Sequence, residues 1–101
     1  MKITTTTTTD NAVVIAPEGC LDTASTPEFE QAVNDALEAN ATAIRIDLAG
    51  VEFISSSAIR TIVALKKKLD AKNGTLVLCN LNDAVHEVLD MTGLLTILTV
   101  E

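Results

Sequence analysis

Residues 47–60 read Asp-Leu-Ala-Gly-Val-Glu-Phe-Ile-Ser-Ser-Ser-Ala-Ile-Arg, and this stretch decides the fold. The residues that lead into it, Ile44 to Leu48, alternate between apolar and charged side chains, which predicts a strand with one apolar face. From Ile59 onward the apolar residues recur at helical spacing instead. Three serines, residues 55–57, therefore lie where a strand gives way to a helix. Serine hydroxyls at such a place can accept hydrogen bonds from the unpaired N–H groups of the helix.

The composition fits one small domain with an aliphatic core. The chain has 101 residues, and domains typically hold roughly 100–150. Apolar residues make up 48% of it, yet Phe29 and Phe53 are the only aromatic ones. A core of Val, Ile, Leu and Ala suits helices packed on a sheet.

The N-terminal part is expected to form an antiparallel hairpin. Six threonines, Thr4 to Thr9, are β-branched strand formers, and they lead through Asp10-Asn11 into the apolar run 12–16. Pro17-Glu18-Gly19 should then end the second strand, and residues 19–27 should form a loop.

Helices and strands should alternate after this hairpin. The first expected helix follows a cap at Ser25 or Thr26 and ends near Asn40, the second runs from the serines to Asn73-Gly74, and the third runs from residues 80–83 to Gly93. The expected strands after the hairpin are Ala43–Leu48, Thr75–Cys79, which should be buried on both faces, and Thr96–Val100. Strands that alternate with helices imply parallel crossovers. The sequence therefore predicts an α/β domain with a mixed β-sheet that carries an N-terminal antiparallel hairpin.

The charge of the chain argues against nucleic acid as a partner. Fourteen acidic and seven basic residues give a net charge of −7, whereas phosphate backbones need clustered Lys and Arg. The one basic cluster, Lys66-Lys67-Lys68, lies beside Arg60 on the second helix. We interpret it as a solvated helix face, with a phosphate site as the alternative.

Metal, membrane and catalytic functions find no support in the residue pattern. Cys20 and Cys79 with the single His86 do not make a zinc ligand set, and the two thiols are interpreted as reduced. No run approaches the ~20 apolar residues of a membrane span, and the N-terminus lacks a secretory h-region, so we expect a cytoplasmic protein without membrane insertion. No cofactor is implied. His86 should be a partly exposed surface residue. Asp47 should be a structural hydrogen-bond acceptor, and Met91 either a core residue or a rim contact.

At this point the residues resemble those of the STAS domain family, and within it the single-domain anti-sigma factor antagonists of bacteria. The resemblance covers nearly the whole chain, residues 1–101 being one STAS domain, and rests on residues 19–23, 46–59 and 74–76. It implies a mixed sheet with helices packed largely on one face. Two residues depart from the family pattern: Ser55 stands where an Asp is usual, and Ala58 where a Gly is usual.

The resemblance also implies a function. Such a protein binds an anti-sigma factor, usually a serine kinase, and so frees a sigma factor; the kinase breaks the complex by phosphorylating a serine at the start of the second helix, and a phosphatase restores it. By position that serine is Ser57, with Ser56 as the alternative. The partner surface would include Asp22, Thr23, Ser55, Ser56, Ser57, Ala58 and Arg60.

Several alternatives to this interpretation stay open. The serines can be simple caps, with Ser55 or Ser56 satisfying the helix start, and Asp22 can be a turn residue that bonds its own backbone. STAS domains also serve as accessory or scaffold subunits of lipid-transport and signalling complexes. An enzyme is the least favoured class, because a nucleophilic serine needs a base and the chain has no Gly-x-Ser-x-Gly elbow. The oligomeric state and the role of the threonine run stay open.

Overall fold

A computed structural model describes residues 2–8 and 12–101, and in them three helices pack on a six-stranded mixed sheet. In chain order the elements are β1 (Lys2–Thr7), β2 (Ala12–Leu21), α1 (Thr26–Glu38), β3 (Ala43–Asp47), β4 (Gly50–Ile54), α2 (Ser56–Ala71), β5 (Thr75–Cys79), α3 (Asp83–Met91), the 3-10 turn η1 (Leu94–Thr96) and β6 (Thr99–Val100). The expected alternation of strands and helices is confirmed, and one strand, β4, was not expected.

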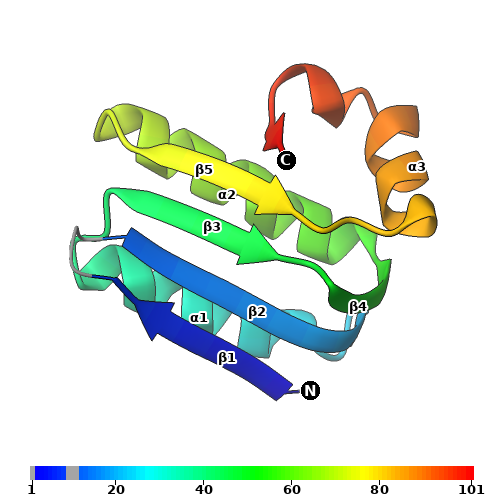
Figure 1. Cartoon of the computed structure of the whole chain (residues 1–101), viewed down its shortest axis with the longest axis horizontal. Coiled ribbons are helices and arrows are strands. Elements are labelled where there is room, and N and C mark those ends of the chain that lie inside the picture. The colour runs from blue at the N-terminus through cyan, green and yellow to red at the C-terminus, as the bar shows by residue number, and fades with distance from the viewer. Residues whose placement is uncertain (1, 9–11) are drawn as a thin grey trace.

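The sheet combines one antiparallel pair with parallel crossovers. Its strand order is β1-β2-β3-β5-β6, and β4 pairs with β2 alone. β1 runs antiparallel to β2, whereas β3, β4, β5 and β6 run parallel to their neighbours. The predicted hairpin and mixed sheet are therefore correct (Figure 1). The predicted turn at Asp10-Asn11, and Thr9 before it, lie outside the described residues.

Helices α1 and α2 cover one face of the sheet. Figure 1 shows both helices behind the strands. The burial pattern agrees, because Val13 and Ile15 of β2 are buried, whereas Val14 and Ala16, which alternate with them, are half-buried. The opposite face is only partly covered, so the expectation that β5 is buried on both faces is wrong for Val77, which is half-buried.

Strand β2 continues past the point where the sequence predicted a break. Pro17 falls between the two parallel partners of β2, because pairing with β3 stops at Ile15 and pairing with β4 starts at Glu18. Its missing N–H therefore removes no bond of either ladder. Gly19, at a φ of 107°, then forms an irregularity before Cys20 that lets the strand run on to Leu21.

The end of α2 and the last strand also differ in detail from the prediction. The left-handed residue after α2 is Asn73, with a φ of 59°, where the sequence allowed either Asn73 or Gly74. The last strand is short: the segment predicted as Thr96–Val100 forms η1 first, and only Thr99 and Val100 pair with β5.

Gly74 is required by close packing. A Cβ there would lie 2.6 Å from the carbonyl oxygen of Thr42 and 3.0 Å from Cδ2 of Leu69. We expect Gly74→Ala to lower the free energy of unfolding by roughly 1–3 kcal/mol, because backbone has to move to admit the methyl group. Urea unfolding followed by circular dichroism measures this. Gly50→Ala is the matched control: its Cβ would meet Cγ of Glu18 at 2.8 Å, an exposed side chain that can swing away, so its cost should be smaller. Equal costs would contradict the packing argument.

Candidate functional site

The parallel strands β2 and β4 end side by side and bring two loops together. Leu21 is the register partner of Ile54, and the Ser55 N–H donates to the Leu21 carbonyl at 2.8 Å. The loop that starts at Asp22 and the serine turn therefore lie side by side, at the carboxyl ends of two parallel strands.

The three serines have different environments. Ser55 is the N-cap of α2: its backbone is extended, and its Oγ accepts a long hydrogen bond from the Ala58 N–H at 3.4 Å. Of the two caps that the sequence allowed, it is the one used. Ser56 is exposed and Ser57 half-buried. Neither hydroxyl makes a hydrogen bond to the part of the chain that the structure describes, so both stay available for chemistry.

The remaining candidate residues divide into exposed and buried ones. Thr23 and Arg60 are exposed, consistent with a place on a contact surface. Ala58 lies on the buried side of α2 and is fully buried, so it cannot touch a partner. Its inclusion in the partner surface is wrong, because this position in the first turn of α2 faces the hydrophobic core.

Asp22 orders the loop after β2. Its Oδ1 accepts from the Ser25 N–H at 2.9 Å and from the Ser25 hydroxyl at 2.7 Å. The hydroxyl bond first, and the backbone bond second, lower the pKa of Asp22 below its ordinary value. The interpretation as a turn residue is therefore correct, and the side chain is also exposed.

A hollow of about 530 Å³ lies between α1 and α2 and opens beside Ser57. Arg60 and Lys67 of α2 line one side, and Glu30 of α1 lines the other. Arg60 lies three residues after Ser57, on the neighbouring position of the same helix face. A negative group on Ser57 would thus lie within reach of one guanidinium and of the helix N-terminus.

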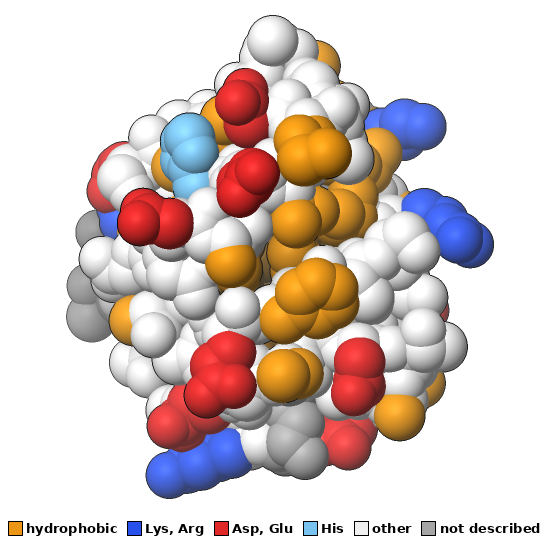
Figure 2. All heavy atoms as spheres, turned by 90° about the vertical axis from the view of Figure 1, so that its right-hand side faces the viewer, with side chains coloured by type: hydrophobic (Ala, Val, Ile, Leu, Met, Phe, Trp, Pro, Cys, Tyr) orange, Lys and Arg blue, Asp and Glu red, His pale blue; other side chains and the backbone are white. Residues whose placement is uncertain are grey.

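The end of the molecule that carries the serine turn also exposes apolar side chains. This end is the right-hand side of Figure 1, where α3 packs against β4. Figure 2 shows hydrophobic side chains gathered in a band over this end, with acidic groups on both sides. Phe53 of β4 is 49% exposed and Met91 of α3 is 79% exposed. Met91 is therefore not a core residue, and Phe53 is a surface residue that the sequence did not single out.

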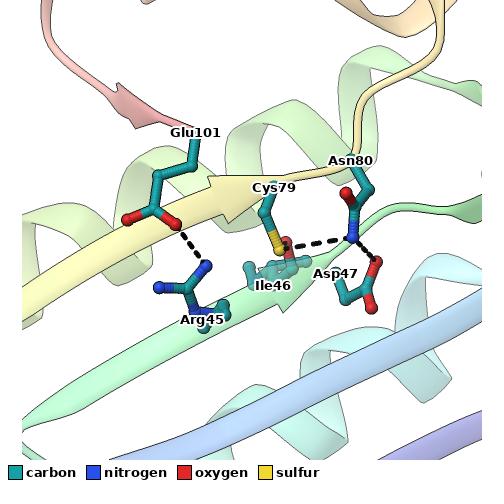
Figure 3. Close-up of polar contacts among 6 residues, drawn as sticks. All are labelled: Arg45, Ile46, Asp47, Cys79, Asn80 and Glu101. Carbon is teal, nitrogen blue, oxygen red and sulfur yellow. Dashed lines mark hydrogen bonds and ion pairs between the residues drawn. The ribbon is translucent and has the colours of Figure 1, made fainter.

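The side-chain amides of Asn80 and Asn82 make hydrogen bonds at this end of the sheet. Asp47 Oδ1 accepts from the Asn80 amide (Figure 3) and from the Ala49 N–H, both at 3.0 Å. Asn82 caps α3 through a 2.8 Å bond from Val85 and donates to the Val51 carbonyl at 2.9 Å. The two amides tie the loop before α3 to Asp47 at the end of β3 and to Val51 in β4. Asp47 is thus the structural acceptor that the sequence predicted.

Titratable side chains elsewhere do not gather into a metal site. Within residues 2–8 and 12–101, no three His, Cys, Asp or Glu side chains converge to hold an ion. Cys20 is exposed and Cys79 is buried, and both are free thiols. His86 is exposed on α3, as predicted. No helix in these residues has the length and apolarity to cross a bilayer.

Comparison with known proteins identifies the fold and the family. The STAS domain model matches residues 4–101, so the chain belongs to the STAS domain family. A candidate anti-sigma factor antagonist of Bordetella bronchiseptica, BtrV, is 28% identical over 91 residues, which cover 90% of this chain and 78% of BtrV. The anti-sigma F factor antagonist of Paenibacillus polymyxa is 33% identical over 57 residues, which cover 56% of this chain and 49% of that protein.

Solved structures agree with this assignment. The crystal structure of a candidate anti-sigma factor antagonist of Thermotoga maritima matches with a TM-score of 0.90 and 26% identity, over 97% of this chain and 84% of that one. The Bacillus cell fate determinant SpoIIAA in its phosphorylated form shares the fold, with a TM-score of 0.78 and 22% identity, over 99% of this chain and 91% of that one.

The Asp47 contacts generate a pH-dependent prediction. The bond from Asn80, and then the one from the Ala49 N–H, lower the pKa of Asp47 below its ordinary value of 3.8. A lowered folded-state pKa means that the carboxylate contributes stability above about pH 3.8 and loses it as pH falls through the folded-state pKa. We expect Asp47→Asn to lower the free energy of unfolding at pH 7 by roughly 1 kcal/mol.

The difference between wild type and Asp47→Asn should shrink as pH falls below 3.8. Urea unfolding from pH 7 to acid measures it. Asp90→Asn is the control, because it removes an exposed carboxylate whose side chain makes no hydrogen bond to the described residues. A difference that grows on acidification would overturn the assignment.

Proposed function

We propose that this protein is an anti-sigma factor antagonist that binds an anti-sigma factor of the serine-kinase type. Phosphorylation by that kinase on Ser57, with Ser56 as the alternative, releases the partner, and a phosphatase restores binding. The observation that carries the proposal is the place of Ser57: a reachable hydroxyl in the first turn of α2, beside the loop of Asp22. The names of the similar proteins support the same class.

The chemistry of a phosphate at Ser57 favours a change of surface without a change of fold. Ser57 stands in the first turn of a sixteen-residue helix, where free N–H groups and the positive end of the dipole stabilise negative charge. Arg60, one turn along, adds a cation. The domain therefore keeps its structure when about two negative charges are added.

A phosphate on Ser57 instead weakens the binding of the partner. The unmodified hydroxyl is small and neutral, and it lies at an end of the molecule where exposed apolar side chains offer a docking surface. A partner that covers Ser57 must desolvate whatever the side chain carries, and a phosphate is far more costly to desolvate than a hydroxyl. A coupling free energy of ~3 kcal/mol would change affinity by roughly 100-fold.

The proposed contact surface consists of exposed and half-buried residues around the serine turn. It comprises Asp22, Thr23, Ser55, Ser56, Ser57 and Arg60. The protein acts by binding and catalyses no reaction in this proposal. Since its target would control transcription, we place it in the cytoplasm.

Ser57→Asp should imitate the phosphorylated state. We expect the variant to stay folded and to bind the anti-sigma factor, purified after affinity capture from the native cell, roughly 100-fold more weakly than wild type. Isothermal titration calorimetry measures affinity, and circular dichroism reports folding. Ser56→Asp carries the same charge one residue away and tests the alternative site, and Ser57→Ala is the control, which should keep binding and lose phosphate incorporation. Equal affinity of wild type and Ser57→Asp would exclude the switch at this residue.

Asp22 should contribute to binding through its exposed carboxylate. We expect Asp22→Asn to weaken binding to the same partner by about tenfold, because an amide keeps the turn but removes the charge. Ser25→Ala is the control: it deletes one of the two turn bonds to Asp22 and leaves the carboxylate in place. If Ser25→Ala weakens binding as much as Asp22→Asn, the partner depends on the order of the loop and not on the charge of Asp22.

A further inference from the structure

Strand β1 is an unprotected edge of the sheet. It stands at one end of the strand order, and five of its six residues are exposed. Natural edge strands are usually shielded by charge, proline, a bulge or shortness. Residues 2–7 contain no proline, pair with β2 in an unbroken register, and carry a single charge at Lys2. At the other end of the sheet, the described edge strand β6 has only two residues.

The register of the hairpin shows which backbone groups point outward. The Thr8 N–H donates to the Ala12 carbonyl at 2.8 Å, immediately beyond the paired residues Thr7 and Val13. In an antiparallel pair, residues that exchange hydrogen bonds with the neighbour alternate with residues whose groups point away. By this alternation the even-numbered residues of β1 bond to β2. The N–H and C=O groups of Ile3, Thr5 and Thr7 therefore face the open side.

We propose that this open side pairs with the β1 strand of a second copy of the chain, antiparallel and about a two-fold axis at Thr5. Thr5 then opposes Thr5 of the second copy, and Ile3 opposes Thr7. Each of these pairs exchanges both of its N–H···O bonds, so all the outward groups of the three residues are satisfied. The two sheets become one continuous sheet.

A second copy suits this edge for two reasons. A run of identical β-branched residues offers the same cross-strand Thr–Thr contacts in either direction, so the strand complements itself. The edge is also nearly uncharged in a chain of net charge −7, so two acidic molecules can approach there with little direct repulsion.

The neighbouring helix limits the strength of the pair. A shallow hollow beside β1 is lined by Thr5 and by the α1 residues Glu28 and Asp35. After pairing, the α1 helices of both copies lie on the same side of the joined sheet, where their carboxylates repel. Dimerisation should therefore be weak and should strengthen as salt screens this repulsion.

The pairing leaves the serine turn uncovered. β1 and β4 lie on opposite sides of β2, and Ser55 follows β4. Dimerisation is thus independent of the proposed partner binding, and a failure of one proposal does not touch the other.

Sedimentation velocity over a wide concentration range, at about 0.15 M and then higher salt, tests the dimer. We expect a monomer–dimer equilibrium that shifts toward dimer with salt. Thr5→Pro should raise the dissociation constant roughly tenfold or more, because it removes the N–H bonds of the central pair and leaves those to β2 intact. Thr5→Ala keeps the N–H and should dimerise like wild type within a few-fold. A chain that stays monomeric at all concentrations, or larger assemblies in place of dimers, would overturn the proposal.

Amide hydrogen exchange by NMR locates the interface. On going from dilute to concentrated protein, the amides of Ile3, Thr5 and Thr7 should gain protection, while those of Thr4, Thr6 and Thr8 are protected throughout. A dimer in which the three odd-numbered amides stay unprotected would show that the copies meet elsewhere, and the proposal would be wrong. Protection of these amides by an added threonine-strand peptide, in a chain that forms no dimer by itself, would likewise replace the second copy by a foreign strand.

Discussion

The hydrogen bond from the Ser55 N–H to the Leu21 carbonyl is the constraint on which the site depends. It continues the parallel pairing of β4 with β2 by one residue, into the helix cap itself. Because of it, the start of α2 cannot shift along its axis without breaking a strand pair. The loop of Asp22 and the first turn of α2 are therefore held at fixed relative positions by the sheet.

The parts of the fold that the sequence predicted are those with strong local signals. Helix α3 has an Asn82 cap and a regular apolar stripe, and both strands of the hairpin are rich in β-branched residues. Strand β4 was missed because its burial pattern does not alternate: Val51 and Ile54 are buried, whereas Glu52 and Phe53 between them are exposed. Its existence depends on β2 continuing beyond Pro17, a long-range event that no local pattern reports.

The candidate site shows the same division between local and tertiary information. The place of the serines at a helix start follows from the change of period, and the structure adds only which of them caps. Burial of Ala58 and exposure of Phe53 and Met91 could not be predicted, since they depend on how α2 and α3 cross the sheet. Near the first turn of a helix, apolar spacing has too few residues to fix the rotation of the helix.

The distribution of charge bears on how the proposed phosphorylation of Ser57 would act. Of the seven basic residues, five belong to α2 or its C-cap: Arg60, Lys66, Lys67, Lys68 and Lys72. The rest of the chain is strongly acidic, so Arg60 is the cation that a group on Ser57 meets first. In the proposed switch, a phosphate on Ser57 would be stabilised by the start of α2 and by Arg60. Its cost would then fall on the complex and not on the folded domain, which is the condition for switching binding while leaving stability unchanged.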